Sequence, residues 1–452
     1  MKKYDVIVCG GGTAGMIAAI SSARTGASTL LVERDGFLGG TATYGLPFLG
    51  FFSGDGTKVI GGIPQELVDR MVEIGGSVGH VRGGTWKTGK GEYDYEFSLT
   101  PYDPEFLKFV VQEMALEAGV ELMLQSVLIG TQLDKNRITY IELMTVEGRK
   151  KVKADVFVDA TGDAMLTWLA GFPTKLRGRG NMQNVTHVIR VGNVDVERMV
   201  ESLKEEKVII GFKDWYIRLL RGKLIDGDEG FVHVAGHAKL WDDKPPLTFT
   251  GVRWRKDEIS FNITRTTNID PTKVSDINRA EINERKNVMS VIKRMRELVP
   301  GFEKAYLIST SVRVGIREGR RIQGIFTLTE KDVIERGEFP DGIARGAYPI
   351  DIHDPKGGET KFTFIKGGGS YGIPYRCLIP KGSDNLVVAG RCVSTTGKAL
   401  GSVRLMSTCM ALGQAAGTAA ALASKGSISP SKIEIDHLQN RLLEDKAILK
   451  VS

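Results

Sequence analysis

The chain is poor in cysteine, with four in 452 residues, and it has no long apolar run and no block of like charge. The cysteines form no Cys-x-x-Cys pair and no metal-ligand or iron–sulfur spacing, which argues against disulfide, redox and metal roles. We therefore interpret them as small core residues, namely Cys9, Cys377, Cys392 and Cys409. Charge or glycine breaks every apolar stretch, so we expect no membrane span. The N-terminus has no signal-peptide pattern, so we expect a cytoplasmic protein.

Charge and length limit the protein class further. The net charge of +7 and the pI of about 9.0 are mild for this length, and the basic residues are scattered. Nucleic-acid binding has no supporting motif, and a small anionic substrate suits the bias better. A chain of 452 residues exceeds the usual size of one hydrophobic core, so we expect two domains.

The N-terminal segment YDVIVCGGGTAGMIAAISSARTGASTLLVE is the most informative part of the chain. An apolar run ends in Gly10-x-Gly12-x-x-Gly15, a helical pattern follows, and a second apolar run ends at Glu33. This order is typical of a dinucleotide site: the first glycine permits the tight turn, the second lets a pyrophosphate approach, and the third lets helix and strand pack closely. The helix N-terminus would hold the pyrophosphate, and the carboxylate would accept both adenosine ribose hydroxyls and repel a 2′-phosphate.

Three later segments narrow the type of nucleotide. They are GGTAT at 39–43, DATGD at 159–163 after an apolar strand, and NLVVAGR at 385–391 leading to LGSVR at 400–404 and a small-residue helix. Together with the glycine motif, they resemble the FAD-dependent oxidoreductases with a glutathione-reductase-type nucleotide fold. The order is most similar to the branch of succinate dehydrogenase and fumarate reductase flavoproteins and its uncharacterised bacterial relatives.

The resemblance implies noncovalent FAD, with the 39–43 segment around the pyrophosphate and ribityl chain and the 401–404 turn directing N–H groups at the flavin pyrimidine edge. It also implies Val127 beside the adenine and the 160–163 segment beside the adenosine. Many relatives have Gly-Asp where this chain has Gly390-Arg391, which leaves Arg391 able to pair with a phosphate. The expected FAD-binding residues are Gly10, Gly12, Thr13, Ala14, Gly15, Glu33, Arg34, Gly39, Gly40, Thr41, Ala42, Thr43, Val127, Ala160, Thr161, Gly162, Asp163, Gly390, Arg391, Gly401, Ser402, Val403 and Arg404.

The predicted fold class is α/β. A Rossmann-like FAD-binding domain with a central parallel sheet would comprise residues 1–170 and 370–452, and a substrate domain with a second, mixed β-sheet and helices would comprise 171–369. We expect a helix at 105–118, strands at 120–127, 137–146, 151–158, 184–192, 229–237 and 247–266, and helices at 195–206, 212–222 and 276–298. Residues 44–100 look like an excursion that lies partly over the flavin.

A second glycine pattern, Gly367-x-Gly369-x-x-Gly372, is not a nucleotide site by our interpretation. Pro374 argues against a helix after it, and no acid follows at the required place, so we expect a loop. The chain therefore lacks a separate NADPH domain as well as a Cys-x-x-Cys, and electrons would come from the substrate, from transiently bound NAD(P)H or from an electron-transfer protein.

The catalytic residues are less clearly marked in the sequence. His187 lies on a predicted strand where relatives place residues over the flavin, while Tyr371 and Arg376 flank the return to the nucleotide domain. Arg317 and Arg320 would share a helix face with Arg313 and could clamp a carboxylate or phosphate. Structural roles remain the alternative for the histidine and for the arginines, and His353 lies in a predicted loop.

Three functions are compatible with these features. The first is an FAD-dependent dehydrogenase or reductase that moves a hydride between flavin N5 and a small organic substrate, with an anion favoured by the charge. The second is an NAD(P)H-dependent flavin monooxygenase. The third is a flavin-binding electron-transfer subunit of a larger complex.

Overall fold

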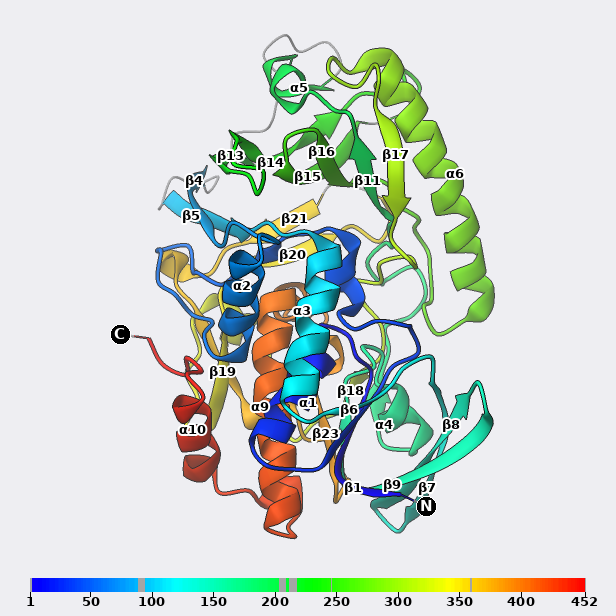
Figure 1. Cartoon of the computed structure of the whole chain (residues 1–452), viewed down its shortest axis with the longest axis vertical. Coiled ribbons are helices and arrows are strands. Elements are labelled where there is room, and N and C mark those ends of the chain that lie inside the picture. The colour runs from blue at the N-terminus through cyan, green and yellow to red at the C-terminus, as the bar shows by residue number, and fades with distance from the viewer. Residues whose placement is uncertain are drawn as a thin grey trace.

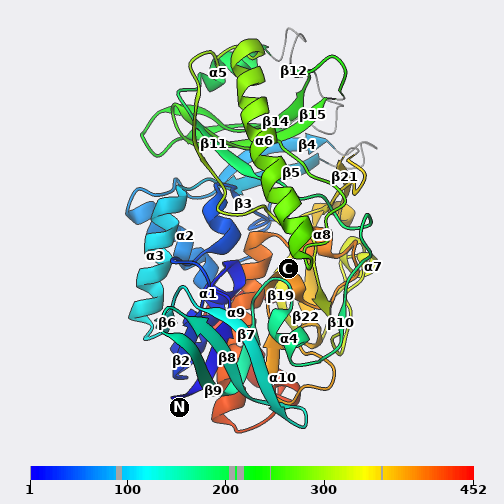
Figure 2. The ribbon, with the colours of Figure 1, turned by 90° about the vertical axis from the view of Figure 1, so that its right-hand side faces the viewer.

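A computed structural model of the chain describes residues 2–87, 94–202, 209–210, 218–244, 246–357 and 360–451. Two main sheets lie at opposite ends of an elongated molecule, and a bundle of helices lies beside the lower one (Figure 1). Figure 2, turned by 90°, shows the long helix α6 running down from the upper sheet toward the lower half.

The lower sheet has the strand order β6-β2-β1-β9-β8-β7, and β23 pairs with the last three residues of β9 on the edge opposite β1. Strands β6, β2, β1, β9 and β23 are parallel, while β7 and β8 form an antiparallel extension on the first half of β9. The bounds are β1 Lys3–Cys9, β2 Thr29–Val32, β6 Glu121–Met123, β7 Val127–Asp134, β8 Arg137–Thr145, β9 Gly148–Asp159 and β23 Leu386–Val388. The predicted α/β class with a central parallel sheet is confirmed.

Small residues allow two helices to lie close together on this sheet. Helix α1 (Thr13–Arg24) packs on α9 (Met406–Lys425), the orange helix beside it in Figure 1. A Cβ at Gly413 would lie 2.2 Å from the Ala14 carbonyl oxygen, and one at Gly417 would lie 2.0 Å from the Ala18 carbonyl oxygen. Both contacts advance by four residues in each helix, so the helices run parallel with their N-termini at the same end.

The upper sheet has the order β12-β14-β15-β16-β11-β17, with β13 also paired to β14. Every recorded pairing among its described residues is antiparallel, so the sheet that we expected to be mixed is antiparallel. Helix α6 (Val274–Leu298) covers one face through Val288, Val291 and Met295. The bounds are β11 Val188–Gly192, β12 Ile209–Ile210, β13 Arg218–Lys223, β14 Glu229–Ala238, β15 Leu247–Arg255, β16 Glu258–Asn262 and β17 Tyr306–Thr310.

Two predicted elements of this region were wrong in detail. The strand predicted at 247–266 is the hairpin β15–β16, because Arg255 pairs with Glu258 across a two-residue turn. The helix predicted at 212–222 falls partly outside the described residues, and 218–223 form strand β13. The helix α5 (Val196–Ser202) corresponds to the one predicted at 195–206, whose last four residues also lie outside the description.

Shorter elements connect the two halves. The 44–100 segment forms β3 (Phe48–Leu49), α2 (Ile63–Glu73), β4 (Val81–Lys87) and β5 (Asp94–Thr100), and β5 contributes Phe97 and Leu99 to a core shared with Trp254 of the upper sheet. The remaining elements are α3 Pro104–Glu117, α4 Met165–Leu169, β10 Thr174–Lys175, β18 Arg321–Ile322, α7 Glu330–Ile334, β19 Gly342–Gly346, β20 Ile350–His353, β21 Thr360–Thr363, β22 Tyr371–Pro374, α8 Leu400–Val403 and α10 Ile435–Glu444.

The largest core cluster bears on the domain division. It joins α1 and α9 to Ile322, Leu328, Ile343 and Ile365. This membership favours a return to the nucleotide domain earlier than residue 370, and the division at 170 and 370 stays a prediction. The 367–372 glycine segment leads into strand β22, and no helix opens on it.

The four cysteines are buried and unpaired, as we predicted. No helix in the described part of the chain is both long and apolar enough to cross a membrane.

Candidate functional site

The Gly10–Gly15 turn joins β1 to α1, and its three glycines have different surroundings. Gly10 has a φ of +99°, and a Cβ there would lie 2.6 Å from the Ala160 carbonyl oxygen. A Cβ at Gly15 would lie 1.7 Å from the Gly10 carbonyl oxygen, so turn and helix touch. At Gly12, by contrast, no described atom lies within 4 Å of an added Cβ. The protein therefore leaves open space where a pyrophosphate would approach the backbone.

The 39–43 segment lies directly against this turn. The Gly39 N–H donates to the Gly11 carbonyl at 2.9 Å, and a Cβ at Gly40 would lie 2.8 Å from the Gly12 Cα. The Thr13 hydroxyl lies 3.3 Å from that of Thr41. The rest of the segment, Ala42 and Thr43, continues a short 3₁₀ helix at Gly40–Tyr44. Two glycine-rich loops thus form one backbone surface at the carboxyl end of β1.

Glu33 directly follows β2 and lies beside this surface. Its Oε2 accepts the Gly11 N–H at 2.5 Å and its Oε1 accepts the Asp35 N–H at 2.9 Å. A carboxylate has about four acceptor positions, so two remain for the hydroxyls of a ribose. Arg34 is exposed next to it, and Val127, at the start of β7, is 46 % exposed.

The 159–163 segment ends β9 and contains a polar residue that our sequence analysis did not select. Asp159 is fully buried, and its two oxygens accept the N–H and hydroxyl groups of Thr161 and Thr167. The Ala160 N–H donates to the Cys9 carbonyl at 2.9 Å. Asp159 thus holds the loop that approaches Gly10, and an acid at the end of a buried strand was the available signal.

Gly390 and Arg391 come together with Asp163. Gly390 has a φ of +85°, and a Cβ there would lie 3.0 Å from the Ala14 Cβ. The Arg391 guanidinium lies 3.0 Å from Asp163 Oδ1, beside Gly162. We expected this arginine to be available for a phosphate, and the structure pairs it with a carboxylate of its own chain.

The 400–404 turn leads into helix α9, and the backbone N–H groups of the two differ in their partners. The N–H groups of Gly401, Ser402 and Val403 donate to carbonyls of Lys398 and Ala399 within the turn. Helix α9 begins just after it without a side-chain cap among the described residues. The Thr408 hydroxyl in its first turn is buried, and no described residue forms a hydrogen bond with it. The first N–H groups of this 20-residue helix are therefore better placed than those of the turn to donate to a negatively charged group such as the pyrimidine edge of a reduced flavin.

The two helix N-termini are offset along their shared direction. Because Ala14 lies opposite Gly413, α9 begins six residues earlier than α1 does, or about 9 Å at 1.5 Å per residue. In an extended FAD molecule, the negative pyrophosphate and the electron-accepting ring are separated along the molecule. Two helix N-termini offset in this way suit FAD, one for the pyrophosphate and one for the ring.

A buried arginine cluster lies next to this turn. Arg317 donates through Nη1 to the Asn184 carbonyl and side-chain oxygens at 2.8 and 3.0 Å, and through Nη2 to Asn262 Oδ1 at 3.2 Å. Burial, and then the nearby cations Arg404 and Arg265, lower the pKa of Arg317 to about 9. Arg317 is buried, whereas Arg404 and Arg265 are partly exposed, and all three carry a positive charge in one region.

Asp351 and His353 stand beside these arginines. They are two residues apart on β20, and this separation places both side chains on one face of the strand. Arg404 Nη2 lies 3.2 Å from Asp351 Oδ2, and His353 Nε2 lies 3.5 Å from Asp351 Oδ1. Burial would raise the pKa of Asp351, but His353, Arg404 and Arg317 hold it well below its usual range. Burial and then Arg317 lower the pKa of His353 to about 3, so the imidazole is neutral at pH 7.

Two buried nitrogen atoms in this cluster have no acceptor among the described residues. They are Arg404 Nε and Gln183 Nε2, and the Oε1 of the same glutamine accepts the His353 N–H at 3.1 Å. Buried donors are nearly always satisfied, so both point to a missing acceptor such as a ligand oxygen or water. Asp351, Asn184, Gln183 and Arg265 are candidate site residues that we did not predict from the sequence, and His353, which we placed in a loop, is the last residue of strand β20. The Asp-x-His alternation on a strand was the signal that would have identified Asp351 and His353.

The predicted catalytic residues do not gather at one point. The 311–320 segment is irregular rather than helical, so the shared helix face that we expected for its arginines was wrong. Arg313 pairs with Asp35, Arg317 enters the cluster, and Arg320 donates to the Asp163 carbonyl while lying over the Trp168 ring. Only Arg317 of the three lies beside Arg404.

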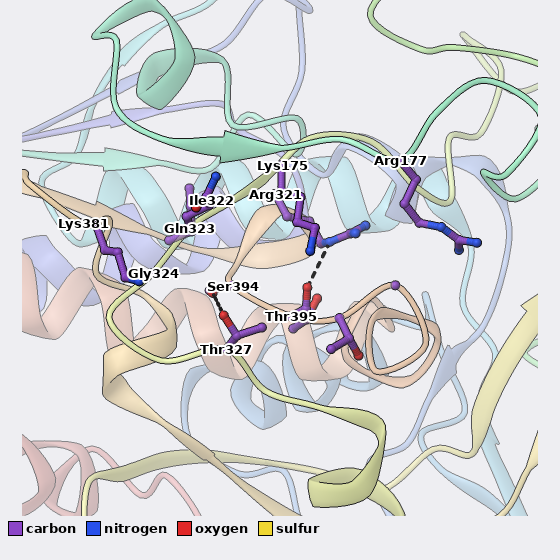
Figure 3. Close-up of a pocket in the computed structure, with 12 residues that line it drawn as sticks. Lys175, Arg177, Arg321, Ile322, Gln323, Gly324, Thr327, Lys381, Ser394 and Thr395 are labelled. Atoms are coloured by element: carbon purple, nitrogen blue, oxygen red, sulfur yellow. Dashed lines mark hydrogen bonds between the residues drawn. The ribbon is translucent and has the colours of Figure 1, made fainter.

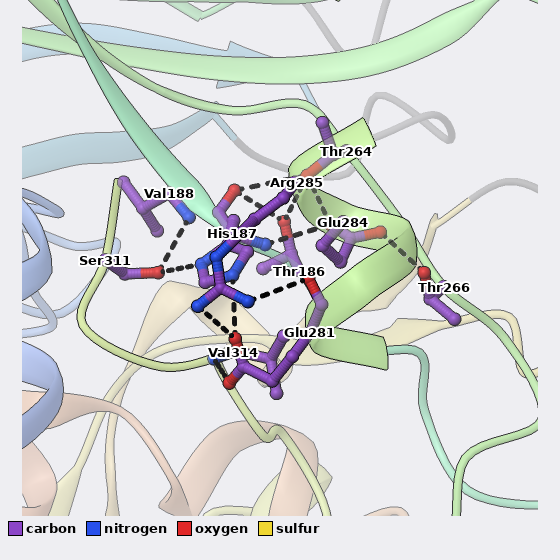
Figure 4. A network of polar contacts seen from close by, with 10 residues as sticks. All are labelled: Thr186, His187, Val188, Thr264, Thr266, Glu281, Glu284, Arg285, Ser311 and Val314. Carbon is purple, nitrogen blue, oxygen red and sulfur yellow. Dashed lines mark hydrogen bonds and ion pairs between the residues drawn. The ribbon is translucent and has the colours of Figure 1, made fainter. Parts of the chain in front are cut away.

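His187 is part of a buried polar network between β11 and α6 (Figure 4). Its Nδ1 lies 2.7 Å from Ser311 Oγ and its Nε2 lies 3.2 Å from Glu281 Oε2, while its N–H donates to the buried Glu284. Burial lowers its pKa. Both ring nitrogens are used by the protein, and this arrangement suits a link between strand and helix.

Tyr371 and Arg376 also have partners within the protein. The buried Tyr371 hydroxyl lies 2.7 Å from Ser402 Oγ, which in turn donates to the Tyr348 carbonyl. These hydrogen bonds stabilise the α8 turn. Arg376 is half-exposed, and its guanidinium and backbone N–H donate three hydrogen bonds to Asp341.

Comparison with known proteins agrees with the motifs. The sequence profile of the family described as FAD dependent oxidoreductase matches residues 5–442. The thiamine thiazole synthase of Aeropyrum pernix is 30 % identical over 222 residues, which is 46 % of this chain and 70 % of that protein.

Two of the solved structures that match this chain are the following. A geranylgeranyl bacteriochlorophyll reductase-like protein from Thermoplasma acidophilum is 14 % identical, with a TM-score of 0.47 over 99 % of this chain and 85 % of that one. The p-nitrophenol 4-monooxygenase PnpA from Pseudomonas putida is 11 % identical, with a TM-score of 0.49 over 100 % and 91 %. On the family match, the chain belongs to the FAD-dependent oxidoreductases, and FAD is its cofactor.

Proposed function

We propose that the protein is a dehydrogenase or reductase that exchanges a hydride between noncovalently bound FAD and a small organic anion. The observation that carries this proposal is the buried cluster of Arg317 and Arg404 beside Asp351 and His353, directly against the turn that leads into α9. The motifs that resemble the succinate dehydrogenase and fumarate reductase branch support the same type of reaction.

The residues of the nucleotide domain suit FAD in the following arrangement. The open backbone at Gly12 and the N-terminus of α1 would hold the pyrophosphate, and Glu33 would hold the adenosine ribose. The first turn of α9, about 9 Å further along, would stabilise negative charge on the pyrimidine edge. When bound, the flavin supplies a two-electron acceptor or donor at N5.

The arginine cluster would bind and orient the substrate. Arg404 has one unsatisfied Nε in addition to the Nη2 that contacts Asp351, so it can donate a further hydrogen bond to a carboxylate. Gln183 Nε2 supplies a second unsatisfied donor. An anion here would also reduce the repulsion between Arg317, Arg404 and Arg265.

His353 and Asp351 would manage the proton. The neutral imidazole holds one proton that it can share between Nε2 and the Asp351 carboxylate, with Nδ1 held 3.1 Å from the Thr360 hydroxyl. With a pKa of about 3, the imidazole is a weak base while the site is empty, but an anion bound beside Arg317 would oppose one of the causes of that low value. We propose that His353 becomes basic enough in this bound state to take the proton that accompanies hydride removal.

The first test is anaerobic absorption spectroscopy of the FAD-loaded protein with a panel of hydroxy acids, uncharged sugars and amines. We expect hydroxy acids to bleach the oxidised flavin band and the uncharged compounds to leave it unchanged. Bleaching by sugars or amines alone would contradict an anionic substrate, and oxygen uptake coupled to NADPH would favour the monooxygenase alternative. Yellow colour in an acid-precipitated pellet would contradict noncovalent binding.

The second test replaces one arginine of the cluster. Arg404→Gln removes a charge-assisted hydrogen bond of about 1.5–3 kcal/mol, so KM for the active acid should rise about 10- to 150-fold. Arg376→Gln is the matched control, because that arginine is half-exposed and pairs with Asp341 away from the cluster. An equal effect of both substitutions, or none of Arg404→Gln, would exclude the cluster as the anion site.

A further inference from the structure

A cavity is lined by residues that belong neither to the proposed flavin site nor to the arginine cluster. It has a volume of about 510 Å³ and opens between the β10 and β18 strands and the loop that leads from Cys392 to α8 (Figure 3). Its lining residues are Lys175, Arg177, Arg321, Ile322, Gln323, Gly324, Thr327, Lys381, Ser394, Thr395, Thr396 and Gly397.

The charge of this cavity has one sign. Four cationic side chains line it, and no carboxylate is among the lining residues. Glu318 lies behind the wall with its side chain fully buried, where it pairs with Arg321 at 3.1 Å and more loosely with Arg177 at 3.5 Å. Lys175 and Lys381 are exposed and have no ion pair among the described residues. One buried carboxylate therefore faces four cations.

Donors inside the cavity are only partly used. Arg321 is 2 % exposed, and its Nε and Nη1 donate to the Thr395 carbonyl and to Glu318, which leaves Nη2 without an acceptor in the described structure. The Thr395 hydroxyl is buried and also lacks a partner there. The Thr327 and Ser394 hydroxyls lie 3.0 Å apart and bond to each other, as Figure 3 shows.

From these features we propose that the cavity is a binding site for a phosphate-bearing small molecule, separate from FAD and from the substrate anion. Two lysines and two arginines provide charges and N–H donors that together exceed what one carboxylate can neutralise. A phosphate ester carries up to two negative charges, and a diphosphate carries more. Hydroxyl groups beside them supply further donors to several oxygen atoms. The volume is that of a small-molecule pocket rather than of a single ion.

The cavity is connected to the flavin region by its own loop. Thr396, which lines it, accepts the Leu400 N–H at 3.1 Å through its carbonyl, and Leu400 begins the α8 turn. An occupied cavity would therefore hold the segment that leads to the start of α9. The proposal rests on the cavity alone and does not depend on the substrate proposed for the arginine cluster.

The test is isothermal titration of the FAD-loaded protein with inorganic pyrophosphate, AMP and malonate at low ionic strength. We expect pyrophosphate and AMP to bind and malonate to bind at least tenfold more weakly. The visible spectrum, recorded in parallel, should show that FAD is retained. Equal binding of malonate would overturn the phosphate class, and the absence of binding by pyrophosphate and AMP would overturn the site. Binding by only one of the two phosphates would support the site and identify whether a nucleoside is required.

Variants locate the binding on the cavity. The pair Lys175→Ala with Lys381→Ala should raise the pyrophosphate Kd at least tenfold, and Thr395→Val should raise it while removing only a hydroxyl. The matched control is Lys432→Ala with Lys450→Ala, which removes two exposed lysines elsewhere. An unchanged Kd in both test variants, or an equal change in the control, would refute the assignment. Because all five positions lie outside the proposed FAD and substrate groups, hydroxy-acid oxidation remains a separate readout.

Discussion

Substitution of Gly12 by alanine separates cofactor binding from folding. Gly12 has φ −70° and ψ −171°, which an alanine adopts without strain, and its added Cβ would touch no described atom. Alanine is less favourable than glycine before a helix, but it also reduces the entropy of the unfolded chain, and these effects oppose each other at about 0.5–1 kcal/mol each. The free energy of unfolding of the FAD-free protein should therefore change by less than about 1 kcal/mol.

FAD binding should respond much more strongly. The Cβ would occupy the space through which the pyrophosphate reaches the N–H groups of α1, and a charge-assisted hydrogen bond lost there is worth about 1.5–3 kcal/mol. The Kd for FAD should rise about 10- to 150-fold. Quenching of free FAD fluorescence on titration measures the affinity, and thermal unfolding of the FAD-free protein measures stability.

Gly15→Ala is the matched control, because we expect it to lower the stability of the FAD-free protein, which Gly12→Ala should leave nearly unchanged. Its Cβ would lie 1.7 Å from the Gly10 carbonyl oxygen, so the turn or helix must shift, and the FAD-free protein should itself lose stability. If Gly12→Ala binds FAD as tightly as the wild type, the pyrophosphate does not lie over Gly12. If Gly15→Ala is as stable as the wild type, the close contact between turn and helix is wrong.

Two further predictions concern the buried acid and the buried histidine. Asp159→Asn replaces one of the oxygens that accept four hydrogen bonds by a donor, which should lower the free energy of unfolding by about 1–3 kcal/mol in a urea titration. Asp384 is exposed, and Asp384→Asn, the control, should change that free energy by less than about 0.5 kcal/mol. Equal effects of the two substitutions would contradict the role of Asp159. The pKa of His353 is about 3 in the folded protein, whereas its ordinary value is 6.5. Between these values the unfolded chain binds a proton that the folded protein does not, so stability falls as pH drops below about 6.5. His353→Gln should therefore lose less in Tm than the wild type between pH 7 and pH 4, and parallel Tm curves for the two proteins would show that His353 does not contribute.

Local patterns were enough to predict the nucleotide half of the protein. The strand that ends at Cys9, the three glycines, the helix and Glu33 are contiguous, and each depends on backbone conformation or on a period of two or 3.6 residues that a short segment already contains. The parallel sheet followed from the order of strand, helix and strand, because parallel neighbours need a crossover between them.

Predictions about the second sheet were less accurate, because strand partners depend on contacts that the local pattern does not contain. The hairpin at 256–257 and the antiparallel order of the upper sheet were both missed. The same reason applies to the 313–320 arginines: their spacing suits a helix, but the segment is irregular and its side chains have partners in separate parts of the fold.

By itself, the sequence determined the dinucleotide turn, its carboxylate and the family, because these reside in residues that are neighbours along the chain. Only the tertiary structure decided which charged groups meet. Arg317, Asp351, His353 and Arg404 come from three separate segments, and the cavity lined by Lys175 and Lys381 joins segments about 200 residues apart in the chain. Burial then sets their chemistry, since the low pKa of His353 and the unsatisfied donors of the arginine cluster arise from the removal of water by residues that are distant in sequence.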